Sequence, residues 1–424
     1  MNKISHRRFT LNFTDAALTV LLTCFVLAAT ATSAKANDGQ LDPSFASNGI
    51  FLDNFNGSTG AASVVAVQSD GKIVAAGQLG QSTQSRAVII RLNKNGSLDN
   101  TFGSGGAVTV RLGDCAHEIT GMAIQNGGKI VVSGLAEFGD PKLFRLNSNG
   151  TFDTSFGNSG FVDLGALRPG PFVLQPDGKI LLIGESFNPS SSLVPEMQRF
   201  NNNGQLDKTF GSGGSALLVF SGNAIALQPD GKILITSTGF SGAGTLVRYN
   251  SNGTLDTTLG TFGQVAALAA PGLAVQPNGG IVTEGTIATE ASSNGNSTGF
   301  GLMRFDASGA IDPTFGTHGA AFAAFPDLPA AAAGPLVIQS NGDIVVAGSA
   351  ATQGSTPGGS FALARFLGTG QLDNTFGDEG IVTTNLGAGA VPSIAALAIQ
   401  TDGKIVAAGT DGAGNLVVAR YLGK

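Results

Sequence analysis

A short motif recurs along the whole chain and restricts its possible folds more than any other feature. The motif reads Gly-x-(Leu/Phe/Ile)-Asp-x-(Ser/Thr)-(Phe/Leu), and one copy spans Gly96–Phe102. Its Asp residues are Asp42, Asp99, Asp153, Asp207, Asp256, Asp312 and Asp373. The intervals between them average about 55 residues, which is typical of a repeat protein. We therefore predict that the chain folds as one repeat array.

Two further patterns lie between successive copies of the motif. The first is an apolar segment that ends in Gln, a tight turn and a second apolar segment, as in Val64–Gly77. Its Asp-Gly and Asn-Gly turns supply the positive φ angles of tight β-hairpins. The second pattern is a strand that ends in Arg, after which come the motif and one more short strand. These Arg residues are Arg91, Arg145, Arg199, Arg248, Arg304, Arg365 and Arg420.

Each repeat therefore contains four short strands. Seven such repeats predict an all-β fold, a seven-bladed β-propeller with four-stranded antiparallel blades. The ends of the repeat region are complementary, because it starts with the Asp42 motif and a strand at Gly49–Phe55 and stops at Arg420–Lys424, just before a motif would follow. We expect the N-terminal strand to complete the last blade and close the ring. A β-solenoid is the alternative, but it would not need complementary ends.

In their order and spacing, these three patterns resemble the delta-60 repeat family of bacterial exported proteins. The resemblance covers nearly all of residues 37–424. It implies a propeller-like fold and export, and it brings no established catalytic activity, cofactor or site residue. One region departs from the pattern, with Leu259 in place of Phe and Gly279-Gly280 in place of Asp-Gly-Lys. We expect an irregular blade there.

The first 36 residues have a different character. Basic residues precede an apolar stretch at Ala16–Ala31, and Ala34-Lys35-Ala36 offers a small-x-small cleavage site before Asn37. We predict a signal peptide at residues 1–36 and a single propeller domain at residues 37–424, exported to the periplasm, the extracellular space or the cell surface. A retained membrane anchor is the alternative, but the stretch is shorter than the ~20 residues of a spanning helix.

Charge and cysteine content limit the possible partners. Cleavage would remove four of 23 basic and one of 29 acidic residues, so the mature chain would carry a net charge of −9. This charge disfavours binding to nucleic acid. Cys115 would be the one remaining cysteine, so no intrachain disulfide could form. We expect a monomer that is stabilised by packing and has no stable transmembrane anchor.

The repeated Asp and Arg residues could suggest a metal or acid–base site, yet structural roles account for them better. A carboxylate at the start of a turn accepts hydrogen bonds from backbone N–H groups two and three residues ahead, and Pro43 and Pro313 suit the position after such a cap. Each Arg is expected to pair with the Asp of a motif. We predict no cofactor. Calcium stays an alternative, although the D-x-D-x-D-G loop pattern is missing.

Catalytic groups are scarce in the predicted mature chain. Its histidines are His117 and His318, and the sequence has no G-x-S-x-G, H-E-x-x-H or paired-Cys zinc motif. The connections on one face of the predicted propeller differ from repeat to repeat, and such loops often carry binding residues. We place a candidate binding site on this face, with Asp114, His117, Glu118 and Arg168 as its polar residues.

The function that these observations favour is a non-catalytic, exported scaffold that presents its variable loops to a protein or a glycan. One alternative is a propeller hydrolase or lyase that uses His117 with Asp114 or Glu118 as an acid–base set. Another alternative is a structural component of the cell envelope.

Overall fold

A computed structural model describes residues 38–53, 55, 58–80, 85–112, 117–136, 141–187, 192–238, 244–268, 272–289, 297–352, 358–387 and 391–423. The chain divides into two compact units, Met1–Asn37 and Asp38–Lys424. The predicted signal peptide lies outside the described residues and stays a prediction. The fold below is that of the second unit. Its described residues include no helix with the length and apolar character that crossing a bilayer requires.

One repeat shows how the local sequence forms a sheet. Its antiparallel strands pair in chain order and are β2 (Gly60–Val67), β3 (Ile73–Leu79), β4 (Arg86–Leu92) and β5 (Ala107–Val110). In the turn between β2 and β3, the Gln68 N–H donates to the Lys72 carbonyl at 2.8 Å, and Gly71 has a φ angle of 83°. Glycine adopts such an angle at no steric cost. The predicted hairpin is therefore confirmed at this Asp-Gly turn.

Four more sheets have four strands each. One contains β6 (His117–Ile124), β7 (Ile130–Ala136), β8 (Lys142–Leu146) and β9 (Phe161–Asp163). The next contains β10 (Leu167–Leu174), β11 (Ile180–Phe187), β12 (Leu193–Phe200) and β13 (Ser215–Leu217). A third contains β14 (Gly222–Leu227), β15 (Ile233–Thr238), β16 (Gly244–Tyr249) and β17 (Gln264–Ala267). The fourth joins the ends of the repeat region, in the order β1 (Ile50–Asp53), β28 (Leu416–Tyr421), β27 (Ile405–Thr410) and β26 (Ser393–Ile399).

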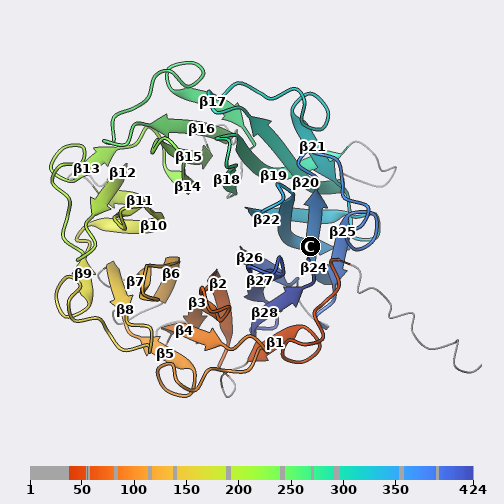
Figure 1. The fold of residues 1–424 in the computed structure, drawn as a ribbon, viewed down its shortest axis with the longest axis horizontal. Helices are drawn as coiled ribbons and strands as arrows, with labels where there is room; N and C mark the ends of the chain where they lie inside the picture. The colour runs from red at the N-terminus through yellow and green to blue at the C-terminus, as the bar shows by residue number, and fades with distance from the viewer. Residues whose placement is uncertain are drawn as a thin grey trace, which may run out of the picture. The chain divides into compact units, whose positions relative to one another are not determined.

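The pairing of β1 with β28 closes the ring of sheets, as the complementary ends predicted (Figure 1). Arg420 of β28 forms an ion pair with Asp42 at 2.8 Å, so the two ends are also joined by side chains. Gln400, at the end of β26, donates to the Gly71 carbonyl of the first repeat at 3.0 Å. Strand pairing, charge and a hydrogen bond therefore all contribute to closure.

The remaining strands form one eight-stranded sheet. They are β18 (Leu273–Val275), β19 (Ile281–Thr289), β20 (Ser297–Phe305), β21 (Ala320–Ala323), β22 (Ala330–Ile338), β23 (Ile344–Ala351), β24 (Gly359–Phe366) and β25 (Ile381–Thr384). The prediction of seven four-stranded blades is therefore wrong, because the described residues form five four-stranded blades and this larger sheet.

The length of β19 and β20 explains the larger sheet. Each has nine residues, against seven in β3 and β4, and the start of β20 reaches β22. Thr298 there pairs in parallel with Ala330. Its N–H donates to the Pro329 carbonyl at 2.8 Å and its hydroxyl to the Ala331 carbonyl at 2.7 Å. Strand length is not part of the repeated motifs, so counting motifs could not reveal this junction.

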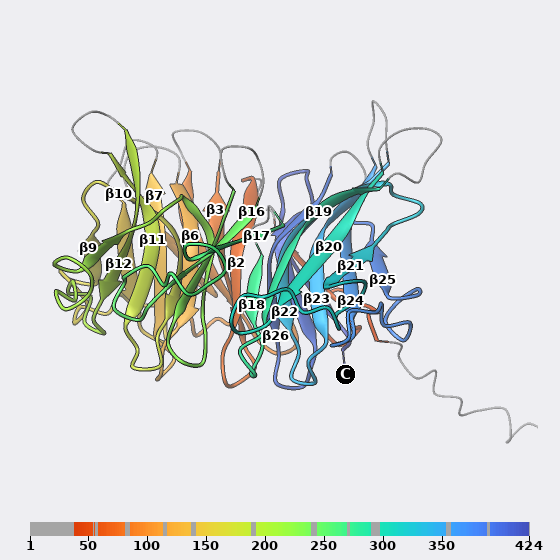
Figure 2. The ribbon, with the colours of Figure 1, turned by 90° about the horizontal axis from the view of Figure 1, so that it is seen from above.

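The core lies between neighbouring sheets, whose strands stand side by side in Figure 2. In β3, Val74 and Ala76 pack toward the sheet of β6–β9, whereas Ile73 and Ala75 pack toward the sheet of β26–β28. All four side chains are fully buried. Because successive residues of a strand point to opposite faces, a strand that is covered on both sides is apolar at consecutive positions.

Candidate functional site

The motif's Asp caps a turn and also pairs with an Arg. Asp99 Oδ1 accepts hydrogen bonds from the Thr101 N–H at 3.0 Å and the Thr101 hydroxyl at 2.7 Å. Asp99 Oδ2 accepts from Arg91 Nε at 2.8 Å. The Arg91 guanidinium lies 4.7 Å from the centre of the Phe102 ring, a cation–π distance. Arg, Asp and Phe thus form one compact cluster, which we call the repeat joint.

The repeat joint occurs around the ring, with Leu259 in place of the Phe beside Arg248 and Asp256. Its ion pairs are Arg91–Asp99, Arg145–Asp153, Arg199–Asp207, Arg248–Asp256, Arg304–Asp312, Arg365–Asp373 and Arg420–Asp42. In five of these pairs a hairpin Lys lies within 3.2 Å of the same Asp. Gly280 and Asp343 take the Lys position beside Asp312 and Asp373. Among the described residues, Arg304 and Arg365 are therefore the only cations that pair with Asp312 and Asp373.

The electrostatics of the joint keep its Asp ionised. Burial raises the pKa of the Asp99 carboxyl, but hydrogen bonds from Lys72 and Thr101 and the charge of Arg91 outweigh this effect. The pKa of Asp99 therefore lies well below its usual range. At Asp42 burial is likewise outweighed, first by bonds from Ser44, and the pKa falls to about 2. Such carboxylates are poor general acids or bases at neutral pH.

The same Arg residues also link each repeat to the next. Arg199 donates to the Ser251 carbonyl at 3.0 Å, and Arg248 donates to the Ala307 carbonyl at 2.6 Å. Arg91 makes the equivalent bond to Ser148. Arg365 differs, because its guanidinium instead pairs with the Asp38 carboxylate at 3.0 Å. The Arg side chains are thus occupied by structural contacts and do not form a ring of free ligand-binding groups.

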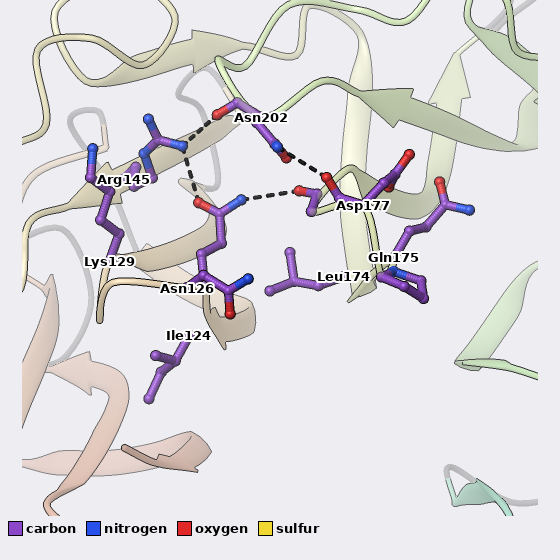
Figure 3. Close-up of a pocket in the computed structure, with 11 residues that line it drawn as sticks. Ile124, Asn126, Lys129, Arg145, Leu174, Gln175, Asp177 and Asn202 are labelled. Carbon is purple, nitrogen blue, oxygen red and sulfur yellow. Dashed lines mark hydrogen bonds between the residues drawn. The ribbon is translucent and has the colours of Figure 1, made fainter. Parts of the chain in front are cut away.

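A hollow beside the joint of Arg145 and Asp153 shows how structural contacts engage the polar side chains (Figure 3). It encloses about 410 Å³ at the hairpin turns of two neighbouring sheets. Arg145 donates to Gln125 Oε1 at 3.0 Å, and Gln125 Nε2 donates to the Gly178 carbonyl at 3.1 Å. Asn202 Nδ2 donates to the Asp177 carbonyl at 3.0 Å. A ligand here would have to break contacts that hold the repeats together, so we do not assign a site to this hollow.

A second cavity, of about 570 Å³, lies at the opposite ends of the inner strands, and we call it the rim cavity. Its lining comes from the starts of β2, β6, β10 and β14 and the ends of β7 and β11. The lining residues are Ser63, Glu118–Thr120, Leu135, Arg168–Pro171, Gly184–Glu185 and Ser221–Asn223. The charged residues among them, Glu118, Arg168 and Glu185, are not part of the repeated motifs.

Backbone irregularities shape the rim cavity. The register of pairing shifts between Ile119 and Gly121 in β6, between Pro169 and Phe172 in β10, and between Gly222 and Ala224 in β14. Such β-bulges bend a strand, redirect its side chains and occur often beside active sites. Gly184 faces the bulge in β10, and a Cβ on it would lie 2.3 Å from the Arg168 carbonyl. Glycine is required there so that the bulged strand can approach.

Three charged side chains of the rim cavity have no structural partner among the described residues. Arg168 lies directly opposite Glu185 in the pairing of β10 with β11, and Glu118 lies at the start of β6. Glu118 and Arg168 are exposed and Glu185 is partly exposed. Within the described ranges, no hydrogen bond or ion pair engages these three side chains. Two carboxylates and one guanidinium are therefore free to meet a ligand.

The structure brings together two of the four residues predicted for the site. Glu118 and Arg168 line the same cavity, although Arg168 lies in β10 rather than in the predicted loop. The backbone of His117 begins β6 and pairs with Ala136. Asp114 and the His117 side chain lie outside the described part of the chain, so the hypothesis that His117 acts with Asp114 or Glu118 as an acid–base set stays a prediction.

Sequence reasoning missed Glu185, Ser63 and Asn223. Glu185 could have been found, because it follows Gly184 at a position where other repeats have uncharged residues such as Gln78 and Leu135. Among the residues that the structure describes, no group of three or more His, Cys, Asp or Glu side chains could hold a metal ion.

Sheets of mostly antiparallel strands, set around a ring and linked by a repeated joint, define a β-propeller repeat protein. The chain belongs to the family described as domain of unknown function (DUF5122) beta-propeller. Its family pattern matches residues 68–102, 125–156, 175–210, 228–259, 276–315 and 339–376. Each match runs from a hairpin Gln to the last residue of a motif. The predicted resemblance to a family of β-propeller repeat proteins is therefore confirmed. The match does not show that this family is the delta-60 repeat family.

Comparison of this chain with solved structures shows similarity of fold only. They include a catalytically inactive virginiamycin B lyase from Staphylococcus aureus with quinupristin (TM-score 0.49, 12% identity, 88% of this chain and 99% of that chain). An alpha-L-arabinanase from Penicillium chrysogenum complexed with arabinobiose has a TM-score of 0.43, 14% identity and coverage of 72% and 92%. The polysaccharide lyase Uly1 has a TM-score of 0.45, 11% identity and coverage of 85% and 89%. No curated protein shows a significant match to the sequence.

Proposed function

We propose that this protein is an exported, non-catalytic binding module whose rim cavity receives a polar segment of a protein or a glycan. Residues 1–36 would direct it to the periplasm, the extracellular space or the cell surface. The main support is a contrast between two sets of charged residues. The repeated Arg and Asp side chains are engaged in joints, whereas Glu118, Arg168 and Glu185 have no such role.

The chemistry of the rim cavity favours a hydrophilic ligand. A guanidinium such as that of Arg168 donates two parallel hydrogen bonds to a carboxylate. Glu118 and Glu185 can accept hydrogen bonds from hydroxyl or ammonium groups. The described residues of the lining include no aromatic ring on which a sugar could stack. We therefore expect a glycan or peptide that carries a carboxylate and neighbouring hydroxyl or amino groups.

A thermal-shift screen of the purified protein against acidic glycans and peptides tests this proposal. A ligand at 100 times its Kd that binds only the folded state adds about 2.7 kcal/mol of stability, which is a readable shift. We expect Arg168→Ala to weaken binding of a hit about tenfold, because an exposed charge–carboxylate contact is lost.

Arg111→Ala is the matched control, since Arg111 is an exposed arginine just after the outer strand β5 and outside the rim cavity. It should bind as the original protein does. Equal affinities of the Arg168→Ala and original proteins would contradict the assigned cavity. A screen without a single carboxylate-bearing hit would contradict the proposed ligand class.

A further inference from the structure

One buried acid has no part in the joints or in the rim cavity. Glu284 lies within β19, and its side chain is fully buried. Its Oε1 accepts a hydrogen bond from the Gly272 N–H at 2.8 Å. Its Oε2 has no hydrogen-bond partner within the described part of the chain. Glu284 lies in a strand whose neighbouring residues are apolar or uncharged, and no repeated motif predicts its burial.

Few charges are available to compensate an ionised Glu284. The strands β14, β20 and β22 pack against β18 and β19. Arg304 is the one ionisable residue on these five strands besides Glu284 itself. Its guanidinium is engaged by Asp312 at 2.9 Å and by the Gly368 carbonyl. No free cation on these strands therefore faces the Glu284 carboxyl.

Burial without a cation raises the pKa of Glu284 to about 8, although the Gly272 hydrogen bond opposes the rise. The side chain is therefore neutral at pH 7. Once ionised, the carboxylate would need water, because a buried charge without a partner is costly.

The contact of Glu284 is made at the start of the shortest described inner strand, β18. β18 has three residues, whereas the described inner strands β2, β6 and β10 have eight each. Gly272, which immediately precedes β18, approaches so closely that a Cβ on it would lie 2.4 Å from Glu284 Cγ. The side chain of Glu284 thus extends a short backbone pairing by one more hydrogen bond.

We infer that Glu284 is a proton-operated latch: in its neutral form it holds the start of β18 against β19, and its ionisation opens this part of the inner wall to water. The open form hydrates the carboxylate and breaks the contact with Gly272. The device goes beyond the proposed binding function, since it does not require a ligand.

The sign of the pH dependence follows from proton linkage. A carboxyl with a pKa of about 8 when buried and its ordinary value of 4.5 when hydrated favours the closed form at low pH. The opening constant should rise about tenfold per pH unit between those two values and level off above about pH 8.

Hydrogen–deuterium exchange of the full protein at pH 5.5, 6.5, 7.5 and 9, corrected for intrinsic exchange rates, measures this opening. We expect protection of the Gly272–Val275 amides to fall about tenfold per unit up to pH 7.5 and then to level off. Glu284→Gln keeps the shape but removes the titration, so its protection should not change with pH. The exposed Glu379→Gln serves as control and should behave as the original protein does.

A second variant covers the case that Glu284→Gln folds poorly. Glu284→Ala introduces the residue that β3, β23 and β27 carry before the same glycine, as Ala76, Ala347 and Ala408. It too should lack the pH dependence. Constant protection across the range in the original protein, or an unchanged fall in both Glu284 variants, would overturn the latch.

Discussion

Replacing Arg365 by Met is expected to lower the free energy of unfolding by about 3–5 kcal/mol, the usual cost of removing one partner from a buried ion pair. Arg365 is fully buried and pairs with Asp373 at 2.8 Å and with Asp38 at 3.0 Å. Asp343 stands where most repeats have a hairpin Lys, so Asp373 would be left without a cation. Urea unfolding followed by far-UV circular dichroism measures the loss.

The matched control is Arg199→Met. Arg199 makes the same pair with Asp207, but its side chain is 11% exposed and Lys179 also lies 3.2 Å from Asp207. Because the carboxylate keeps one cation, we expect a loss of about 1–2 kcal/mol, between the values for exposed and buried pairs. Equal losses in the two variants would show that the hairpin Lys has no compensating role.

The second large effect is expected from removing the strand that closes the ring. A chain that starts at Ser58 lacks Asp42, β1 and the buried Phe45. It leaves Arg420, which is 3% exposed, without its acid, and it uncovers the hydrogen-bonding edge of β28. The lost ion pair alone costs about 3–5 kcal/mol, so we expect the truncated chain to unfold at much lower urea concentration and to associate through the open edge.

A chain that starts at Asp38 is the control for this truncation, because it keeps every described closing contact. It should unfold as the original protein does and elute as a single species from a size-exclusion column. If the chains starting at Asp38 and Ser58 have the same unfolding midpoint, closure by β1 contributes nothing to stability.

Much of the fold could be predicted because its determinants are local and repeated. The Asp-Gly turn at Gly71 requires a positive φ angle, and that requirement can be read directly from the sequence. The pairing of Arg420 with Asp42 could be predicted from the order of patterns alone, since each end of the repeat region lacks what the other supplies.

The eight-stranded sheet could not be predicted, because it depends on how far single strands extend. Thr298 reaches Ala330 where the starts of two nine-residue strands, β20 and β22, meet. The rim cavity is similar: the sequence predicts Glu118 and Arg168 as candidate binding residues, but Glu185 joins them through the register of β10 with β11. A short motif does not state which side chains of two strands such a register places opposite each other.

Hydrogen–deuterium exchange of the protein with and without a carboxylate-bearing hit from the screen tests most directly where ligands bind. If the rim cavity is the site, bound ligand should increase protection at Glu118–Thr120, Arg168–Gly170 and Ser221–Asn223 and leave the hairpin turn at Gln125–Gly128 unchanged. Protection at the hairpin turns instead, with no change around the rim cavity, would contradict the proposed site.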